Sequence, residues 1–204
     1  MTQDSTVSSA LLLSDSGPFV EKLQGFIQRP QQQRMAAAIE EVLLDGGSLV
    51  VEAGTGTGKT LAYLVPAIMT GMTIIVSTGT RNLQDQLFFN DIPLIRDALD
   101  IPFNASILKG RSNYLCPHRL ALSLKGEQLG VGISFDELDT IRAWSTGTTT
   151  GDISEITGIE ESSSIWPSVT STVDNCLGST CPKISECPVY QARARANEAD
   201  LIIV

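Results

Sequence analysis

The segment Ala53-Gly-Thr-Gly-Thr-Gly-Lys-Thr60 decides the fold of this chain of 204 residues. An apolar run, Leu49-Val50-Val51, precedes it, and a helix-forming run, Leu61-Ala62-Tyr63-Leu64, follows it. A strand, a glycine-rich turn and a helix in this order form a phosphate-binding P-loop, in which backbone N–H groups and the positive end of the helix face a triphosphate. Ala53 stands where the general pattern has its first glycine. The pattern predicts nucleotide binding.

Two side chains of this segment carry the expected chemistry. Lys59 is predicted to reach the outer phosphates, and Thr60 to place its hydroxyl group on Mg²⁺. Both are therefore candidate catalytic residues. The other positions are predicted to surround the phosphates with their backbone, and they are Gly54, Thr55, Gly56, Thr57 and Gly58.

Hydrophobic periodicity around the segment predicts alternating helices and strands. Apolar side chains at helical spacing, with Pro30 in the first turn and Gly46-Gly47 at the end, predict a helix over residues 30–45. Such an alternation is typical of an α/β fold with a parallel sheet covered by helices. The further predicted elements are strands at 48–52, 73–77 and 105–108, helices at 59–70 and 80–90, and a buried parallel strand at 201–204.

The alternation stops between residues 111 and 195, which we interpret as an insertion between two strands of one sheet. Ser134-Phe135-Asp136-Glu137 has the pattern of a capping box and predicts a helix that ends near Trp144. Residues 145–172 have the composition of a loop, and residues 193–199 that of a helix. The predicted organisation is a mobile N-terminal segment at 1–17, the first part of the α/β domain at 18–110, the insertion at 111–195 and a return strand at 196–204.

The insertion contains all four cysteines of the chain, Cys116, Cys176, Cys181 and Cys187, with the spacing C-x59-C-x4-C-x5-C. Four thiolates complete the coordination of a zinc ion or of an iron–sulfur cluster. No secretion signal is recognisable, which argues against a disulfide framework. Structural zinc sites more often pair their cysteines at C-x₂₋₄-C spacing, so one lone cysteine and a triplet favour the cluster.

Composition bounds the partners of the chain. The formal net charge of −9 argues against a large nucleic-acid surface, although binding depends on local clusters. The basic side chains are as compatible with phosphate contact as with a solvated face, and they include Lys109, Arg111, Arg119, Lys125, Arg193 and Arg195. No apolar run approaches the roughly 20 residues of a membrane-spanning helix, so we expect no membrane association and a cytoplasmic location.

Several motifs, taken together and in order, resemble those of the iron–sulfur helicases of superfamily 2, the XPD/DinG group, and most of all its DinG/YoaA branch. Alanine at the first position of the P-loop is ordinary in these helicases. The stretches that carry the resemblance are Arg29-Pro30-Gln31-Gln32 (Q-motif region), 52–60 (P-loop), 77–87 (motif Ia), 108–116 (entry to the cluster domain) and 176–204 (its exit).

The resemblance implies an ATP-dependent DNA helicase that moves 5′ to 3′, with a RecA-like motor lobe interrupted by a small, mainly helical iron–sulfur domain. It implies that Arg29 and Gln32 bind the adenine of ATP, that Lys59 holds the β- and γ-phosphates and that Thr60 holds Mg²⁺. Single-stranded or forked DNA and other repair or replication proteins are the implied partners. The implied ligands of a [4Fe–4S] cluster are Cys116, Cys176, Cys181 and Cys187.

The chain also departs from the family pattern. It contains no D-E-A-H sequence and no second motor lobe, whereas phosphoryl transfer needs a carboxylate on the metal and a group that orients water. Asp85, Asp91 and Asp97 are predicted to lie on solvated helix faces. We therefore expect a fragment with little or no ATPase and no helicase activity on its own. Two rival interpretations are a non-enzymatic metal-binding module that docks DNA or a partner and has a vestigial P-loop, and a P-loop kinase or other NTPase with a zinc knuckle.

Overall fold

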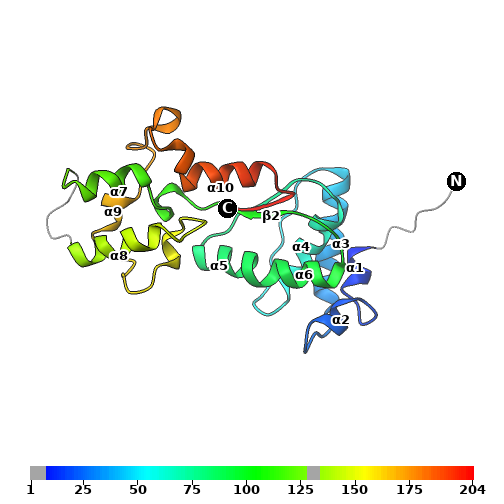
Figure 1. The fold of residues 1–204 in the computed structure, drawn as a ribbon. Coiled ribbons are helices and arrows are strands. Elements are labelled where there is room, and N and C mark those ends of the chain that lie inside the picture. Colours follow the sequence, from blue (N-terminus) through cyan, green and yellow to red (C-terminus); the bar gives the residue numbers. More distant parts are fainter. Residues whose placement is uncertain (1–7, 128–133) are drawn as a thin grey trace. The chain divides into compact units, whose positions relative to one another are not determined.

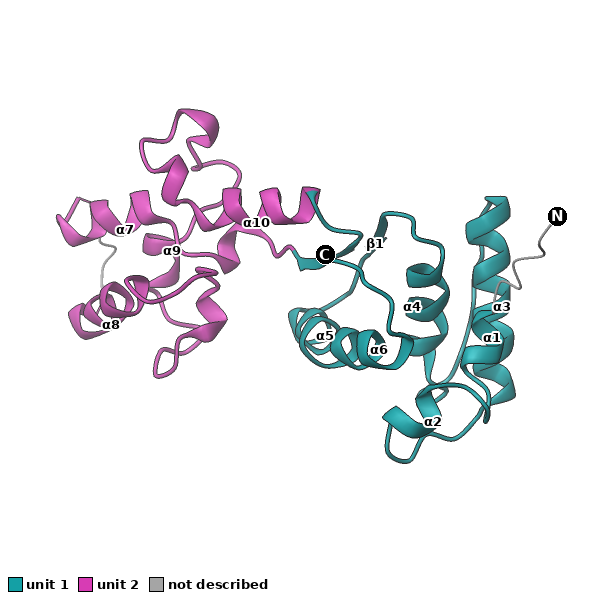
Figure 2. Ribbon diagram, turned by 45° about the vertical axis from the view of Figure 1, so that its right-hand side comes forward, with its two compact units in different colours: residues 1–107, 198–204 teal, residues 108–197 magenta. Residues whose placement is uncertain are grey.

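The computed structural model describes residues 8–127 and 134–204 (Figure 1). The chain divides into two compact units, which are coloured separately in Figure 2. Unit 1 consists of Met1–Ile107 and Glu198–Val204, and unit 2 consists of Leu108–Asn197. The chain therefore leaves unit 1 once and returns to it with its last residues.

Unit 1 contains a parallel sheet of three strands, β1 (Ile74–Val76), β2 (Ala105–Ile107) and β3 (Leu201–Ile203), in the order β1-β3-β2. The last strand of the sequence is thus the central one, and Ile202 pairs with Ile75 on one side and Ser106 on the other. Leu201 and Ile203 are buried. The predicted parallel strands at 73–77, 105–108 and 201–204 are confirmed in slightly shorter form.

The strand predicted at 48–52 is wrong in this structure. These residues form no strand, and the exposed fractions of Leu49, Val50 and Val51 are 41%, 97% and 42%. β-branched and apolar side chains favour a strand only where a neighbouring strand takes up the backbone N–H and C=O groups. Among the described residues, the three strands pair with one another and none pairs with this segment.

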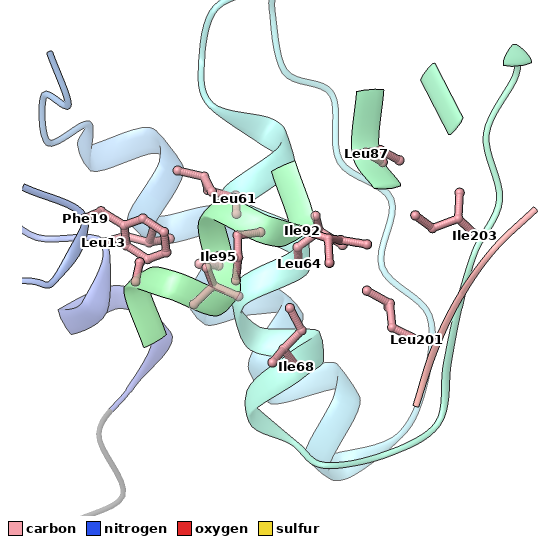
Figure 3. Packing of buried hydrophobic residues seen from close by; sticks show 14 residues of the cluster. Leu13, Phe19, Leu61, Leu64, Ile68, Leu87, Ile92, Ile95, Leu201 and Ile203 are labelled. Carbon is pink, nitrogen blue, oxygen red and sulfur yellow. The ribbon is translucent and has the colours of Figure 1, made fainter. Parts of the chain in front are cut away.

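Helices α3 (Pro30–Asp45) and α4 (Lys59–Met69) pack against each other and confirm both predictions. Pro30 occupies the first turn of α3, where its missing N–H costs nothing, and Gly46 ends the helix with a φ of 80°. Most of α4 is buried, and Figure 3 shows its side chains Leu61, Leu64 and Ile68 within the core. The buried face of α4 therefore fixes the end of the P-loop to the core.

The helix predicted at 80–90 is present, but it continues further and is irregular. It comprises α5 (Arg81–Gln86), a π-helical turn η1 (Leu87–Asp91) and α6 (Ile92–Leu99). The hydroxyl of Thr80 caps its start by accepting a hydrogen bond from the backbone N–H of Leu83 at 3.2 Å. The helix ends at Asp100, whose φ of 52° lies in the left-handed region.

The N-terminal segment differs from the mobile stretch predicted at 1–17, whose first seven residues lie outside the described part. Helix α1 (Ser9–Leu12) packs against α3, and Ser9 donates hydrogen bonds from its N–H and its hydroxyl to Glu40 at 2.9 and 2.6 Å. Leu13 is fully buried in the core together with Phe19 of α2 (Phe19–Lys22). The buried side chain of Leu13 thus fixes a Ser-rich segment, which was predicted to be mobile, to the core of unit 1.

Unit 2 is mainly helical in its described part. Its α-helices are α7 (Pro117–Leu124), α8 (Phe135–Ser145), α9 (Trp166–Val169) and α10 (Pro188–Asn197). Short 3₁₀ turns join them: η2 (Arg111–Asn113), η3 (Ile153–Glu155), η4 (Gly178–Thr180) and η5 (Ile184–Glu186).

The helix predicted after Ser134 is confirmed, and the hydroxyl of Ser134 accepts a hydrogen bond from the N–H of Glu137 at 3.5 Å. The carboxylate of Glu137 accepts a hydrogen bond from the hydroxyl of Ser163 at 3.0 Å. The side chain of Glu137 thereby ties α8 to the loop before α9. The predicted helix at 193–199 begins earlier, at Pro188, and ends at Asn197.

None of the helices in the described part of the chain is long and apolar enough to cross a membrane.

Candidate functional site

The P-loop joins an extended segment to the N-terminus of α4. Residues 55–57 form a turn, and Gly56 and Gly58 have φ angles of 75° and 79°. Helix α4 begins directly afterwards at Lys59, and within the described part of the chain no side chain caps its N-terminus. The first N–H groups of a helix have no acceptor within the helix and carry partial positive charge. The loop therefore opens onto a site suited to an anion.

Lys59 reaches back across this loop. Its ammonium group donates hydrogen bonds to the carbonyl oxygens of Ala53 at 2.9 Å and Gly54 at 2.7 Å. The hydroxyl of Thr57 donates to the carbonyl of Gly54 at 3.0 Å. Lys59 is thus held at the mouth of the loop, where a phosphate would replace carbonyl oxygens as its partner. Its predicted contact with the β- and γ-phosphates stays a prediction.

Gln32, predicted to bind adenine, lies against the P-loop. Its exposed fraction is 2%, and its side-chain amide donates a hydrogen bond to the carbonyl oxygen of Gly58 at 2.9 Å. The side-chain oxygen of Gln32 is buried and has no hydrogen-bond partner among the described residues. A buried acceptor without a partner is costly, so this oxygen is available to a donor that enters the site. Arg29 precedes α3 as its N-cap residue.

A cavity of about 460 Å³ separates the first half of α3 from the P-loop. Arg29, which was predicted to bind adenine, does not line this cavity, whereas Gln31 and Arg34 do. Their spacing is a usable signal, because positions i, i+3, i+4 and i+7 share one face of a helix. The lining residues on α3 are Gln31, Gln32, Arg34, Met35 and Ala38.

The contact between Gln32 and Gly58 allows a direct test. In Gly58→Ala, the new Cβ would lie 2.2 Å from the side-chain nitrogen of Gln32, and the φ of 79° strains any residue other than glycine. We expect the substitution to lower the free energy of unfolding by about 1–3 kcal/mol. Chemical denaturation followed by circular dichroism measures this. The control is Gly54→Ala, because a Cβ there meets no atom within 4 Å; equal losses in both variants would contradict the prediction.

The four predicted cysteine ligands line a single cavity of about 240 Å³ in unit 2. All four are free thiols of intermediate exposure. Cys116 precedes α7, Cys176 and Cys181 flank η4, and Cys187 stands between η5 and α10. The turns thus bring together cysteines as far apart in the sequence as Cys116 and Cys187, which are separated by 71 positions.

Hydrogen-bond donors surround two of the sulfur atoms in this cavity. Burial raises the pKa of the Cys116 thiol, hydrogen bonds from the backbone N–H groups of Arg119 and His118 lower it, and Cys187 and Cys181 raise it further. The guanidinium of Arg111 donates a hydrogen bond to the sulfur of Cys176 at 3.1 Å. Three donors are therefore already directed at two of the sulfur atoms.

No group of three or more His, Cys, Asp or Glu side chains within the described ranges is arranged to hold a single metal ion. A zinc ion would need its four sulfur atoms about 2.3 Å from one point. A cluster of several iron atoms instead occupies a volume, with its ligands around the outside. Four thiols that line one cavity have the donor chemistry that both kinds of centre use.

Comparison with known proteins agrees with this site. The P-loop and its adjoining cavity belong to a unit with a parallel sheet, which the chain leaves and rejoins. The chain belongs to the DEAD/DEAH box helicase family, whose sequence profile matches residues 29–163. This range includes the P-loop, the α3 face and Cys116, whereas the other three cysteines follow it.

Individual proteins of known function show which members of this family the chain resembles. The chain is 47% identical to the ATP-dependent DNA helicase YoaA of Escherichia coli and 45% identical to that of Haemophilus influenzae, over 92% and 96% of its length. It is 36% identical to the ATP-dependent helicase DinG of Mycobacterium tuberculosis over 88% of its length. In each case it spans about 30% of the relative. The resemblance to the DinG/YoaA branch is confirmed.

Proposed function

We propose that this chain provides the ATP-binding part and an iron–sulfur insertion of a DNA helicase that moves 5′ to 3′ and acts in DNA repair. The observation that carries the proposal is the P-loop of unit 1, because Lys59 and the uncapped N-terminus of α4 meet at its mouth. The names of the relatives, which are ATP-dependent DNA helicases, support ATP as the nucleotide and DNA as the substrate.

In this proposal each element of the site has a separate task. The N–H groups at the start of α4 and the ammonium group of Lys59 bind and neutralise the phosphates. Thr60 contributes its hydroxyl to the coordination of Mg²⁺. The cavity beside α3 receives the base, where the buried side-chain oxygen of Gln32 offers an acceptor to the exocyclic amino group of adenine.

The cavity of unit 2 is proposed to hold a [4Fe–4S] cluster through Cys116, Cys176, Cys181 and Cys187. Such a cluster, once bound, cross-links the segments that carry its ligands, since metal binding is coupled to folding. Arg111 would hydrogen-bond a ligand sulfur as it does now. Zinc is the less favoured alternative, because structural zinc sites more often pair their cysteines at short spacing, whereas this chain has one lone cysteine and a triplet.

Single-stranded or forked DNA is the proposed substrate. Three arginines, Arg111, Arg119 and Arg193, line the cysteine cavity in a chain whose net charge is −9. A local basic group of this kind can contact phosphates despite the overall acidity. Other repair or replication proteins are the proposed protein partners.

The nucleotide site is tested by Lys59→Ala with a fluorescent ATP analogue. We expect the variant to bind at least about tenfold more weakly, because charge-assisted hydrogen bonds to phosphate are lost. The matched control is Lys125→Ala, an exposed lysine of unit 2, which should bind like the unsubstituted chain. Absence of binding by the unsubstituted chain would favour the non-enzymatic metal-binding module with a vestigial P-loop.

We also expect the 204-residue chain to hydrolyse ATP no faster than the background rate without protein. The reason is that it contains no D-E-A-H sequence, whose carboxylate would complete the coordination of the metal. A steady-state assay measures this. Turnover that Lys59→Ala abolishes would contradict the expectation while supporting the nucleotide site.

A further inference from the structure

Two glutamine side chains tie the start of α3 to the N-terminal segment. The side-chain nitrogen of Gln33 donates a hydrogen bond to the carbonyl oxygen of Ala10 at 2.9 Å. The side-chain oxygen of Gln33 accepts a hydrogen bond from the side-chain nitrogen of Gln28, also at 2.9 Å. The side-chain oxygen of Gln28 accepts one in turn from the backbone N–H of Asp15 at 3.2 Å. A continuous chain of hydrogen bonds therefore joins two points of the N-terminal segment to α3.

Backbone groups set the direction of this hydrogen-bond chain at both of its ends. A carbonyl oxygen can only accept and a backbone N–H can only donate. The carbonyl of Ala10 therefore selects the nitrogen of the Gln33 amide, and the N–H of Asp15 selects the oxygen of the Gln28 amide. Each amide then has one remaining group for the other, and these two groups are a donor and an acceptor. The arrangement thus suits an amide side chain at both positions.

The N-terminal strap, which we define as residues 9–17, is itself fixed to unit 1. Helix α1 packs against α3 (Figure 2), and Ser9 donates two hydrogen bonds to Glu40 of α3. Gln33 and Glu40 are seven positions apart, so they share one face of the helix. Leu13 of the strap is fully buried in the core. The strap is therefore a fixed support for the residues that bind to it.

The stretch between the two glutamines, residues 29–32, leads to the proposed nucleotide site. Successive residues of a helix point about 100° apart. Gln33 can therefore face the strap while Gln32 faces the P-loop and donates a hydrogen bond to the carbonyl oxygen of Gly58 at 2.9 Å. Gln31 and Gln32 both line the cavity beside the P-loop. The first turn of α3 is thus held between the strap and the P-loop.

The start of α3 has a particular need for such support. Its N-cap residue is Arg29, and within the described ranges no side chain caps the helix by a hydrogen bond. A helix end without a side-chain cap leaves its first N–H groups unsatisfied and is less stable. A binding group, however, must be held to within about 0.5 Å of its productive position. The contacts of Gln28 and Gln33 supply a constraint of this kind beside the buried side-chain oxygen of Gln32.

We propose that Gln28 and Gln33 are positioning residues, through which the N-terminal strap holds the first turn of α3 in place for the base of the nucleotide. Neither glutamine is among the described residues that line the cavity, so both act through Gln32. The inference rests on the nucleotide site proposed above. It adds to that site two residues and a segment that lie outside every stretch in which the sequence resembles the helicase motifs.

The test compares ATP with inorganic tripolyphosphate, which can use the P-loop but has no base. Competition with a fluorescent ATP analogue gives both dissociation constants, and their ratio is the gain from the adenosine part. Gln33→Met keeps an unbranched side chain of similar length and removes its hydrogen bonds. We expect the gain to fall roughly two- to tenfold in this variant, the range of one hydrogen bond. The dissociation constant of tripolyphosphate should stay within about twofold of that of the unsubstituted chain.

Two further variants accompany this measurement. Gln28→Met leaves the bond between Gln33 and Ala10 in place, so it disturbs the fold less and should lower the gain by a smaller factor in the same direction. Gln24→Met is the matched control, because Gln24 is an exposed glutamine of the same unit, and its gain should equal that of the unsubstituted chain.

A double-mutant cycle separates positioning from a general loss of structure. Gln32→Met should remove most of the gain, and adding Gln33→Met to it should change the gain no further. An unaltered gain in Gln33→Met, additive effects in the double variant, or an equal weakening of ATP and tripolyphosphate would overturn the inference and leave the nucleotide site standing. Failure of the unsubstituted chain to bind either ligand would overturn both.

Discussion

Lys109→Met is expected to lower the free energy of unfolding of unit 2 by about 3–5 kcal/mol, because it leaves a buried carboxylate without its cation. The ammonium group of Lys109 lies 2.6 Å from the carboxylate of Asp152, and the two side chains are 2% and 15% exposed. The N–H of Lys109 also donates a hydrogen bond to the hydroxyl of the buried Tyr114 at 3.0 Å.

Loss of the ion pair should affect more than these two residues, because Asp152 makes further contacts. Its other carboxylate oxygen accepts hydrogen bonds from the N–H and hydroxyl of Ser154 at 3.0 and 2.8 Å and so caps η3. Asp152 also forms an isolated antiparallel bridge with Tyr114. The ion pair therefore ties the start of unit 2 to the loop after α8.

Tryptophan fluorescence during chemical denaturation measures this effect selectively. Both tryptophans of the chain, Trp144 and Trp166, belong to unit 2. The control is Lys183→Met, since Lys183 pairs with Glu186 at 2.8 Å with 41% and 57% of the side chains exposed. An exposed pair of this kind contributes less than about 1 kcal/mol. Similar losses in both variants, compared at equal metal content, would refute the buried-pair argument.

Cys187→Ser is expected to abolish binding of the proposed cluster and to destabilise unit 2, because the remaining three thiolates cannot complete its coordination. Cys187 also packs against the small cluster formed by Tyr114, Val189 and Ala192. Protein purified without oxygen should be brown and contain about four iron atoms per chain. The variant should lose the colour and most of the iron, as measured by elemental analysis.

Two further variants sharpen this experiment. Cys116→Ser, at the cysteine separated from the triplet, should lose the iron as completely as Cys187→Ser. Ser179→Ala lines the same cavity but removes no thiol, and it should keep the full iron content. Stoichiometric zinc without iron, in cells supplied with iron, would replace the cluster by a zinc site. Full retention of iron in Cys116→Ser would contradict a four-cysteine site.

Much of unit 1 could be predicted from local pattern. The helix over residues 30–45 is present with the predicted bounds, because its proline start, its apolar spacing and its glycine stop all act within a few residues of each other. The P-loop that contains Lys59 and Thr60 could also be predicted, because a glycine-rich turn before a helix depends only on neighbouring residues. The family followed from such motifs taken in order.

Other features depended on distant partners. Leu49, Val50 and Val51 have the composition of a strand, yet pairing decides whether a strand forms, and no described strand pairs with them. Gln32 could not be placed against Gly58 from the sequence, because the contact joins residues 26 positions apart. Similarly, Asp91 is only partly exposed, whereas a solvated helix face was predicted, and it lies in the π-helical turn next to the buried Leu87 and Ile92.

The P-loop, the helices that flank it and the family could be predicted from the sequence, because these depend on residue types at short spacing. The tertiary structure was needed to show that β3 is the central strand, that the four thiols share one cavity, and that Gln32 bonds to Gly58. The physical reason is that burial and pairing depend on which distant segments meet, and one chain's local pattern does not specify those partners.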